Sequence, residues 1–248
     1  MKFCVLASGS KGNCTYIEIE NHKFLIDVGT NFLYISKKLN EINVKPNEIE
    51  AIFITHSHTD HISALKRIIK NINPKIYLSE KIMNELNITL DNYEIIEDDI
   101  KFDNFIINTI KLSHDVEECL GYIFNNRVVY ITDTGYINNK YHEILKNKEV
   151  YIIESNHDVD MLMESNRPYF LKMRILGDEG HISNKDCGYY LSKFIGNNTN
   201  HIILAHLSEN NNTKEKALDT VLKYIEYEKN ICVAMQNERT EVIEIWLN

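Results

Sequence analysis

Proline is scarce in this chain, and no glycine- or serine-rich stretch interrupts it. Only three prolines occur among 248 residues. Linkers between domains are commonly exposed stretches rich in proline, glycine and polar residues. We therefore expect one domain over residues 1–248, a length that is sufficient for a large hydrophobic core.

The chain also lacks long apolar runs. A membrane-spanning helix needs about 20 consecutive apolar residues, whereas the longest runs here reach about five. The apolar stretch that begins at Phe3 is too short for the central region of a secretory signal peptide. These absences predict a cytoplasmic protein that does not enter a membrane.

The cysteines show no spacing typical of disulfide or metal sites. There are five, an odd number, and none forms a Cys-x-x-Cys pair: Cys4, Cys14, Cys119, Cys187 and Cys232. Spacing of this kind does not indicate a disulfide framework. We expect reduced thiols that mostly fill the core, as in cytosolic proteins.

The charge balance is acidic, with a formal net charge of −9 at pH 7. Such a charge argues against a protein that coats nucleic acid, because phosphates would be repelled at long range. It does not exclude a nuclease, since local basic patches and bound metals can hold a phosphate.

Four ligand-type side chains are concentrated in one short segment. His56, His58, Asp60 and His61 occupy six consecutive positions. An apolar run at residues 50–54 predicts a buried strand before them, and helical apolar spacing follows them. Imidazole and carboxylate are ligands that borderline divalent metals accept. All four cannot converge on one ion, so two ions are indicated, and a merely solvated polar loop is disfavoured.

Four further candidate ligands each follow a predicted strand. They are His114, Asp133, His157 and His206. Any one of them alone would be interpreted as an ordinary core residue. Because the same placement recurs four times, we expect these side chains to share one edge of the fold, where functional loops commonly lie.

The order of the predicted elements indicates an α/β protein. A three-stranded meander over residues 2–26 is followed by alternating strands and helices. The last helix is expected to bury Ala217, Leu218, Val221, Leu222 and Ile225, and the last strand to span residues 241–247. This order suits two mixed sheets that pack face to face, with helices outside.

The motif His-x-His-x-Asp-His at residues 56–61 resembles that of the metallo-β-lactamase superfamily. The resemblance implies a four-layer αβ/βα sandwich with metals at one edge of its sheets. It assigns His56, His58 and His114 to one ion, and Asp60, His61 and His206 to a second, with Asp133 bridging. The cofactors implied are two divalent ions, zinc, manganese or iron, which share a bridging hydroxide that Asp60 helps to orient.

A second motif, at residues 180–184, resembles the helix start of transfer-RNA maturation nucleases. This resemblance implies that His181 contacts the scissile phosphate and protonates the leaving oxygen. The alternative is a histidine that only satisfies the helix N-terminus.

Five segments together resemble the WalJ (YycJ)-type metallohydrolases, at residues 3–13, 131–135, 154–158, 171–176 and 180–184. The resemblance implies a 5′-to-3′ exonuclease on double-stranded DNA. Acidic residues at 178–179 depart from what a phosphate-binding loop would favour. Candidate substrate contacts in these segments are Ser8, Ser10, Lys11, Asn13, Asn156, His157, Lys172, Arg174, Ser183 and Asn184.

Two other functions are compatible with the sequence. A small-molecule phosphodiesterase, acting for example on cyclic nucleotides, would use the same ligands. A scaffold protein would keep the fold without turnover, but a complete ligand set argues against it. No protein partner is predicted, and the oligomeric state is left open.

Overall fold

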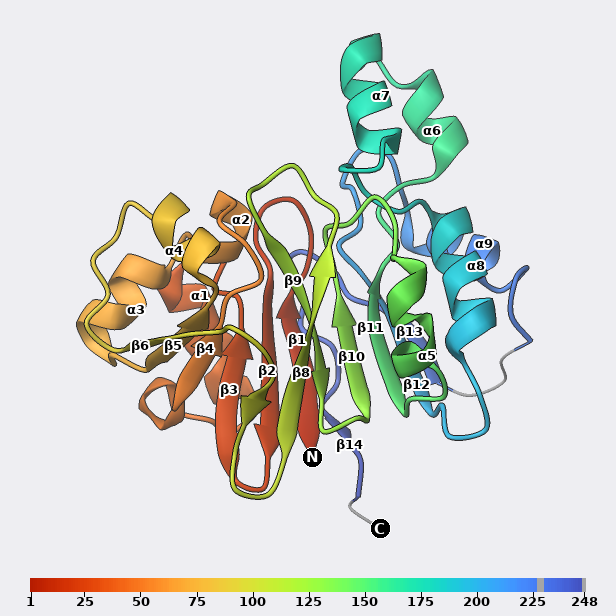
Figure 1. Cartoon of the computed structure of the whole chain (residues 1–248). Coiled ribbons are helices and arrows are strands. Elements are labelled where there is room, and N and C mark those ends of the chain that lie inside the picture. Colours follow the sequence, from red (N-terminus) through yellow and green to blue (C-terminus); the bar gives the residue numbers. More distant parts are fainter. Residues whose placement is uncertain (227–229, 247–248) are drawn as a thin grey trace. The chain divides into compact units, whose positions relative to one another are not determined.

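The structure, a computed structural model, describes residues 1–226 and 230–246. Its chain forms two compact units (Figure 1). One comprises Met1–Glu97 and the segment from Ala234, and the other comprises Asp98–Val233. We call them unit 1 and unit 2. The single domain expected over residues 1–248 stays a prediction.

Unit 1 contains a seven-stranded mixed sheet in the order β14-β1-β2-β3-β4-β5-β6. The predicted meander is confirmed, since β1, β2 and β3 pair antiparallel, whereas β3 to β6 are parallel. The strands are β1 (Lys2–Ala7), β2 (Cys14–Ile19), β3 (His22–Ile26), β4 (Ala51–Phe53), β5 (Lys75–Leu78), β6 (Tyr93–Ile95) and β14 (Ile243–Glu244). The predicted last strand is therefore shorter than expected, and its residue 247 lies outside the described residues.

The helices of unit 1 are α1 (Phe32–Glu41), η1 (Pro46–Glu48), α2 (Thr59–Ile62), α3 (Leu65–Asn71) and α4 (Glu80–Glu85). The apolar spacing after the histidine motif predicts one helix, but the structure has two. They separate because the backbone N–H of Ala64 donates to Val28 O, 2.9 Å away, instead of continuing the helix. Leu65 and Ile68 are buried as predicted.

Unit 2 contains a second seven-stranded mixed sheet in the order β13-β12-β11-β10-β9-β8-β7. Strands β10 to β13 run parallel, and β7 to β10 run antiparallel. Strands β9 and β10 form a hairpin, and Asn125 and Asn126 in its turn have φ values of 49° and 56°, as a tight hairpin turn requires. The strands are β7 (Ile100–Lys101), β8 (Ile106–Leu112), β9 (Cys119–Phe124), β10 (Val128–Ile131), β11 (Val150–Glu154), β12 (His201–Ala205) and β13 (Asn230–Val233).

The helices of unit 2 are η2 (Asn139–Tyr141), α5 (His142–Leu145), α6 (Val159–Glu164), α7 (Tyr169–Leu176), α8 (Asn184–Phe194) and α9 (Lys214–Val221). Helix α8 packs against the sheet through one apolar face, on which Cys187, Leu191 and Phe194 join the buried cluster. The expectation for Leu222 is wrong. Helix α9 ends at Val221, and Leu222 is 42% exposed. None of the helices in the described ranges has the length and apolarity that crossing a bilayer requires.

Gly29 is required by a close backbone approach in unit 1. A Cβ at this position would lie 1.5 Å from the carbonyl oxygen of Asp60, so the motif loop packs directly against the loop that follows β3. Gly29 also donates its N–H to Asn13 O at 2.8 Å. The absence of a side chain at Gly29 therefore allows the histidine motif to pack directly against this loop.

We expect Gly29→Ala to lower the free energy of unfolding by about 1–3 kcal/mol, because backbone must move to admit the methyl group. Differential scanning calorimetry should show a fall in Tm of several degrees for a chain of this size. The matched control is Gly177→Ala, whose Cβ would approach Met173 O no closer than 3.3 Å. Equal Tm values for the two variants would contradict the conclusion that the motif loop packs too closely against Gly29 to admit a Cβ.

Candidate functional site

The motif loop after β4 gathers its imidazoles within unit 1. The ring centroids of His56 and His61 are 4.0 Å apart, and those of His56 and His58 are 4.8 Å apart. His56 and His61 are fully buried, and His58 and Asp60 are partly exposed. The carboxylate of Asp60 approaches Nε2 of His61 at 3.6 Å. Unit 1 thus brings all four motif side chains into one group.

A buried carboxylate holds this group in place. Nδ1–H of His61 donates to Oδ2 of Asp27 at 2.7 Å, and Asp27 also accepts from the backbone N–H and the hydroxyl of Thr55, both at 2.8 Å. Burial raises the pKa of Asp27, an effect that His61 and the Thr55 donors oppose. With Nδ1 engaged, Nε2 carries the lone pair of the ring, the arrangement usual for a metal-binding histidine.

The turn between β1 and β2 supports the same loop. Asn13 donates its backbone N–H to Asp60 O at 2.8 Å, and its amide nitrogen lies 3.0 Å from Nε2 of His61. Its amide oxygen accepts from Gly9 N at 2.9 Å. Among the other candidate contacts on this turn, Ser8 is buried, whereas Ser10 and Lys11 are exposed.

In unit 2 a single carboxylate oxygen holds two imidazoles. Nδ1–H of His181 and Nδ1–H of His206 both donate to Oε1 of Glu154, at 2.8 and 2.9 Å. The second oxygen of Glu154 accepts from the backbone N–H of Thr134 at 3.0 Å. Burial alone would raise the pKa of Glu154, but His181 and the two histidine hydrogen bonds outweigh it and lower the pKa to about 2. Glu154 is therefore a buried, ionised anchor for both rings.

Asp133 completes this cluster. Its Oδ1 lies 3.3 Å from Nδ1 of His206 and 3.8 Å from Nδ1 of His181. One donor atom from each of Asp133, Glu154, His181 and His206 lies within 4.8 Å of the others. Asp133 and His206 both have positive φ, at 60° and 55°, which is a strained backbone for residues other than glycine and is often found at functional sites.

His114 lies beside the same cluster. Its ring centroid is 5.0 Å from that of His181, and its Nε2 is 3.9 Å from Oδ1 of Asp133. Its Nδ1 lies 3.2 Å from the carbonyl oxygen of Gly180, so an Nδ1–H would donate there and leave the Nε2 lone pair available. Unit 2 thus gathers His114, Asp133 and His206, three of the four strand-end residues singled out from the sequence.

His157, the fourth strand-end residue, is only 1% exposed. Neither of its ring nitrogens has a hydrogen-bond partner among the described residues. Burial lowers its pKa to about 4, so the imidazole is neutral at pH 7. Its backbone carbonyl accepts from Asn184 N at 2.9 Å, which ties it to the start of α8.

The other candidate contacts around α8 are engaged within the protein. Asn156 donates its amide to His206 O at 2.9 Å, and Ser155 donates its hydroxyl to the amide oxygen of Asn184 at 2.7 Å. Ser183 caps α8, where it accepts from Asp186 N at 3.2 Å. These contacts position the His206 loop and the helix that follows His181.

Two basic candidates lie on α7. The ammonium group of Lys172 donates to Met163 O at 2.6 Å, at the end of α6, and Lys172 is only 8% exposed. Arg174 forms an ion pair with Asp115, the neighbour of His114, and its side chain is 64% exposed. Lys172 therefore joins two helices, whereas Arg174 remains accessible to solvent.

Two functional residues, Asp27 and Glu154, were not predicted as such from the sequence. Asp27 directly follows β3, and Glu154 is the last residue of β11, so each ends an apolar strand. Both side chains are fully buried. A carboxylate directly after a run of buried apolar residues is the sequence feature that could have identified them.

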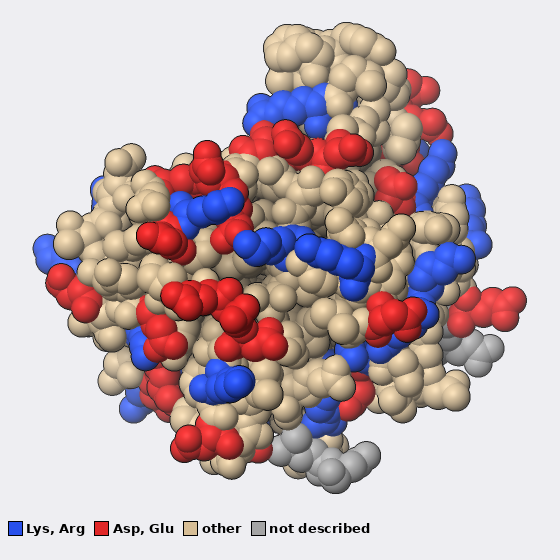
Figure 2. Space-filling view, viewed as in Figure 1, with Lys and Arg blue, Asp and Glu red and all other residues tan. Residues whose placement is uncertain are grey.

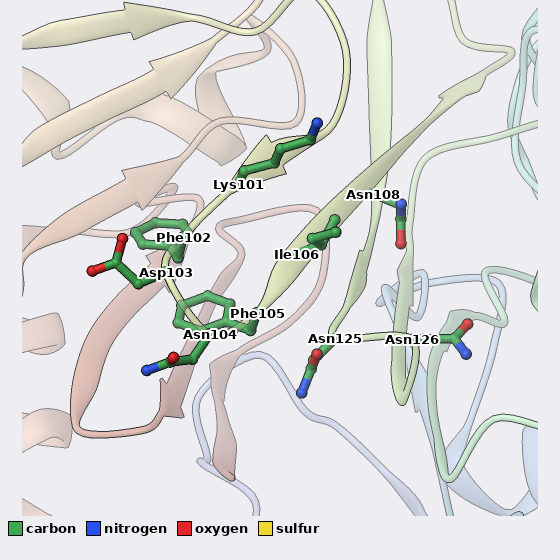
Figure 3. A pocket seen from close by; sticks show the side chains of 9 residues that line it. All are labelled: Lys101, Phe102, Asp103, Asn104, Phe105, Ile106, Asn108, Asn125 and Asn126. Atoms are coloured by element: carbon green, nitrogen blue, oxygen red, sulfur yellow. The ribbon is translucent and has the colours of Figure 1, made fainter.

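A surface cavity of about 450 Å³ lies elsewhere in unit 2 (Figure 3). It is lined in part by Phe102 and Phe105, whose stacked rings are 4.5 Å apart. Ile106, which also lines it, begins β8, whereas His114 follows the other end of that strand. The cavity is therefore separated from the histidine cluster by the length of the strand.

Comparisons with a family model and with known proteins point to the same family. Residues 7–206 match the model of the metallo-beta-lactamase superfamily. Exodeoxyribonuclease YycJ of Bacillus anthracis is 35% identical over 236 residues, which cover 91% of this chain and 89% of that protein. Exodeoxyribonuclease WalJ of Streptococcus pneumoniae is also 35% identical, with 90% of this chain and 88% of that protein covered.

Solved structures show the same fold at low identity. The metallo-beta-lactamase fold protein YhfI from Bacillus subtilis has a TM-score of 0.73 at 15% identity, with 96% of this chain and 98% of that chain covered. The short form of human tRNase Z has a TM-score of 0.67 at 15% identity, with both chains covered completely. Two mixed sheets with helices, the clustered ligands and these matches agree: the chain belongs to the metallo-β-lactamase superfamily, among its WalJ-type metallohydrolases.

Proposed function

We propose that this chain is a metal-dependent exodeoxyribonuclease that degrades double-stranded DNA from the 5′ end. The observation that carries the proposal is the pair of hydrogen bonds by which Glu154 holds His181 and His206. This contact joins a candidate proton donor to a candidate metal ligand. The names of the two relatives, which match nine tenths of the chain at 35% identity, favour DNA over other diesters.

The proposed ligand set is the one expected from the sequence. His56, His58 and His114 hold one ion, Asp60, His61 and His206 hold the other, and Asp133 bridges them. All seven lie within the residues that match the family model. The donors fit a divalent metal, because carboxylates hold Nδ1 of His61 and of His206 and so orient both Nε2 atoms as ligands. Bound zinc, manganese or iron would supply charge neutralisation at the phosphate and a water acidic enough to react near neutral pH.

His181 is the proposed general acid. Its side chain is 21% exposed, so it is accessible to a substrate, and the Glu154 carboxylate fixes its orientation. Because Nδ1 is held by Glu154, Nε2 is the ring atom that would give a proton to the leaving oxygen. The proton is then restored from solvent before the next cleavage.

The candidate DNA contacts divide by exposure. Arg174 and Lys11 present exposed side chains that a phosphate can reach. Lys172 and Asn13 are buried and hydrogen-bonded, so we assign them to positioning rather than to direct contact. His157 is a candidate for a buried, neutral hydrogen-bond donor to the substrate, because its ring nitrogens lack partners in the described part of the chain.

The first prediction tests the nuclease reaction and its metals together. Metal-loaded protein should release mononucleotides from the 5′ end of a labelled duplex, and a chelator should stop the reaction. Elemental analysis should find up to two ions per chain, and His58→Ala should lower this occupancy and abolish cleavage, because a ligand is lost. The control is His22→Ala, which removes an exposed histidine that pairs with Glu50.

Several outcomes would decide against this reaction. Wild-type activity in His58→Ala would rule out the metal mechanism. Hydrolysis of cyclic nucleotides or bis-p-nitrophenyl phosphate, without DNA cleavage under any added metal, would replace the nuclease by a small-diester phosphodiesterase.

The second prediction concerns proton donation by His181. His181→Ala should reduce turnover of DNA by about 10²–10⁴-fold, because the leaving sugar oxygen needs a proton. Turnover of bis-p-nitrophenyl phosphate should change little, since p-nitrophenolate leaves without protonation. Metal content should equal that of wild type. Equal losses on both substrates, or a loss of metal, would assign His181 to another role.

The third prediction concerns Glu154. Glu154→Gln keeps the size of the side chain but removes the charge that orients two imidazoles, so metal affinity and activity should fall by about 10–100-fold. Isothermal titration of the metal-free protein with Zn²⁺ measures the affinity directly. Glu149→Gln is the matched control. Glu149 lies directly before β11, at the opposite end of the strand from Glu154, and pairs with Arg127. Unchanged Zn²⁺ affinity in Glu154→Gln would remove Glu154 from the site.

A further inference from the structure

Helix α7 exposes large apolar side chains and buries a lysine. Tyr169, Phe170 and Met173 are 68%, 69% and 43% exposed, whereas Lys172 is 8% exposed. Residues three and four positions apart share a helix face, so these three apolar side chains form one exposed surface. A surface helix normally buries its apolar stripe and exposes its charges. We call Tyr169, Phe170 and Met173 the α7 face.

Both charged side chains of α7 form polar contacts within unit 2. The ammonium group of Lys172 donates to the last turn of α6, and Arg174 pairs with Asp115. Lys172 therefore joins α7 to α6, and Arg174 connects the hairpin to the rest of unit 2. The hairpin projects beyond the other helices of this unit in Figure 1, and its outermost part carries no charged atoms on the face shown in Figure 2.

The hairpin is connected to the candidate site at both ends. Helix α6 begins directly after His157 and is capped by Asp158, which accepts from Met161 N at 2.9 Å. Helix α7 leads into Gly180 and His181, and His181 N donates to Ile175 O at 2.9 Å. Tyr169 lies six residues before Ile175, which corresponds to a rise of about 9 Å along the helix. The α7 face therefore lies about three nucleotides from His181, since one strand advances about 3.4 Å per nucleotide.

The area of the α7 face favours stacked bases over a protein partner as its occupant. Fully exposed aromatic side chains offer roughly 200 Å² each. At the exposed fractions above, the face and the adjacent Met163 present roughly 400 Å², which is about half of what each partner contributes to a stable protein interface. Two neighbouring rings of this area suit a small number of stacked bases, because base–aromatic stacking is strong and independent of sequence.

We propose that the α7 face is a stacking platform for unpaired bases at the end of the DNA duplex, about three nucleotides from the cleaved bond. The proposal rests on the nuclease function and adds a contact that a small diester cannot make. Exposed Arg174, on the same helix, supplies a positive charge for the backbone of the stacked segment. The platform gives the enzyme a preference for polymers over dinucleotides.

The test is a kinetic comparison of substrates of increasing length. Tyr169→Leu/Phe170→Leu removes both flat rings but keeps the helix and its apolarity. This variant should raise KM for long DNA about tenfold per lost stack, with kcat unchanged. Turnover of a dinucleotide and of bis-p-nitrophenyl phosphate should equal that of wild type. Tyr169→Trp/Phe170→Trp, which restores flat rings, should return KM on long DNA to the wild-type value or below.

A second readout detects the stack itself. The chain contains one tryptophan, Trp246, so Phe170→Trp in a Trp246→Phe background reports from the α7 face alone. Its fluorescence should be quenched by long DNA.

Unchanged KM in the leucine variant, or no quenching, would overturn the platform while the nuclease function stands. A change from dimer to monomer by light scattering in a Tyr169→Ser/Phe170→Ser variant, with normal KM in the leucine variant, would assign the face to a second copy of the chain. If wild type cleaves only small diesters, the nuclease proposal fails, and quenching still decides whether DNA stacks on the face.

Discussion

The hydrogen bonds between buried carboxylates and imidazoles are the interaction on which the candidate site depends. Asp27 holds His61 in unit 1, and Glu154 holds His181 and His206 in unit 2. A hydrogen bond to a buried charged group contributes about 1.5–3 kcal/mol, and leaving such a group without its partner costs more. Each carboxylate therefore fixes the tautomer and the orientation of its histidines at the same time. Both units contain the same kind of contact, which indicates that each sheet positions its own histidines.

The strand ends make this arrangement possible. Strands β10, β11 and β12 are parallel neighbours, with Ile131 beside Ile153 and Glu154 beside Ala205. The residues that follow them, Asp133 and His206, consequently reach Glu154 from either side. Both have left-handed backbones, as does Asp27 at φ 55°. Strain of this kind persists only where surrounding contacts enforce it, and the fully paired sheets supply those contacts.

The sequence predicted most of the strands and the residues at their ends, because apolar runs, turn residues and ligand-type side chains are local features. It did not predict that Asp27 and Glu154 anchor the histidines, since that depends on which strands are neighbours in space. The split between α2 and α3 follows from the contact between Ala64 and Val28, which is also nonlocal. Lys172 was a candidate substrate contact, and only the structure shows that it fastens α6 to α7.

The contact at Gly180 limits how this protein can change in length. A Cβ at Gly180 would lie 2.1 Å from Ile175 O, so the last turn of α7 and the histidine that follows are packed into one stiff segment. An inserted residue between 176 and 181 would rotate the ring of His181 away from Glu154. The turn at residues 165–168, at the other end of α7, carries no such contact with the histidine. Relatives can therefore differ in the reach of the hairpin there while the proton donor stays in register with its carboxylate.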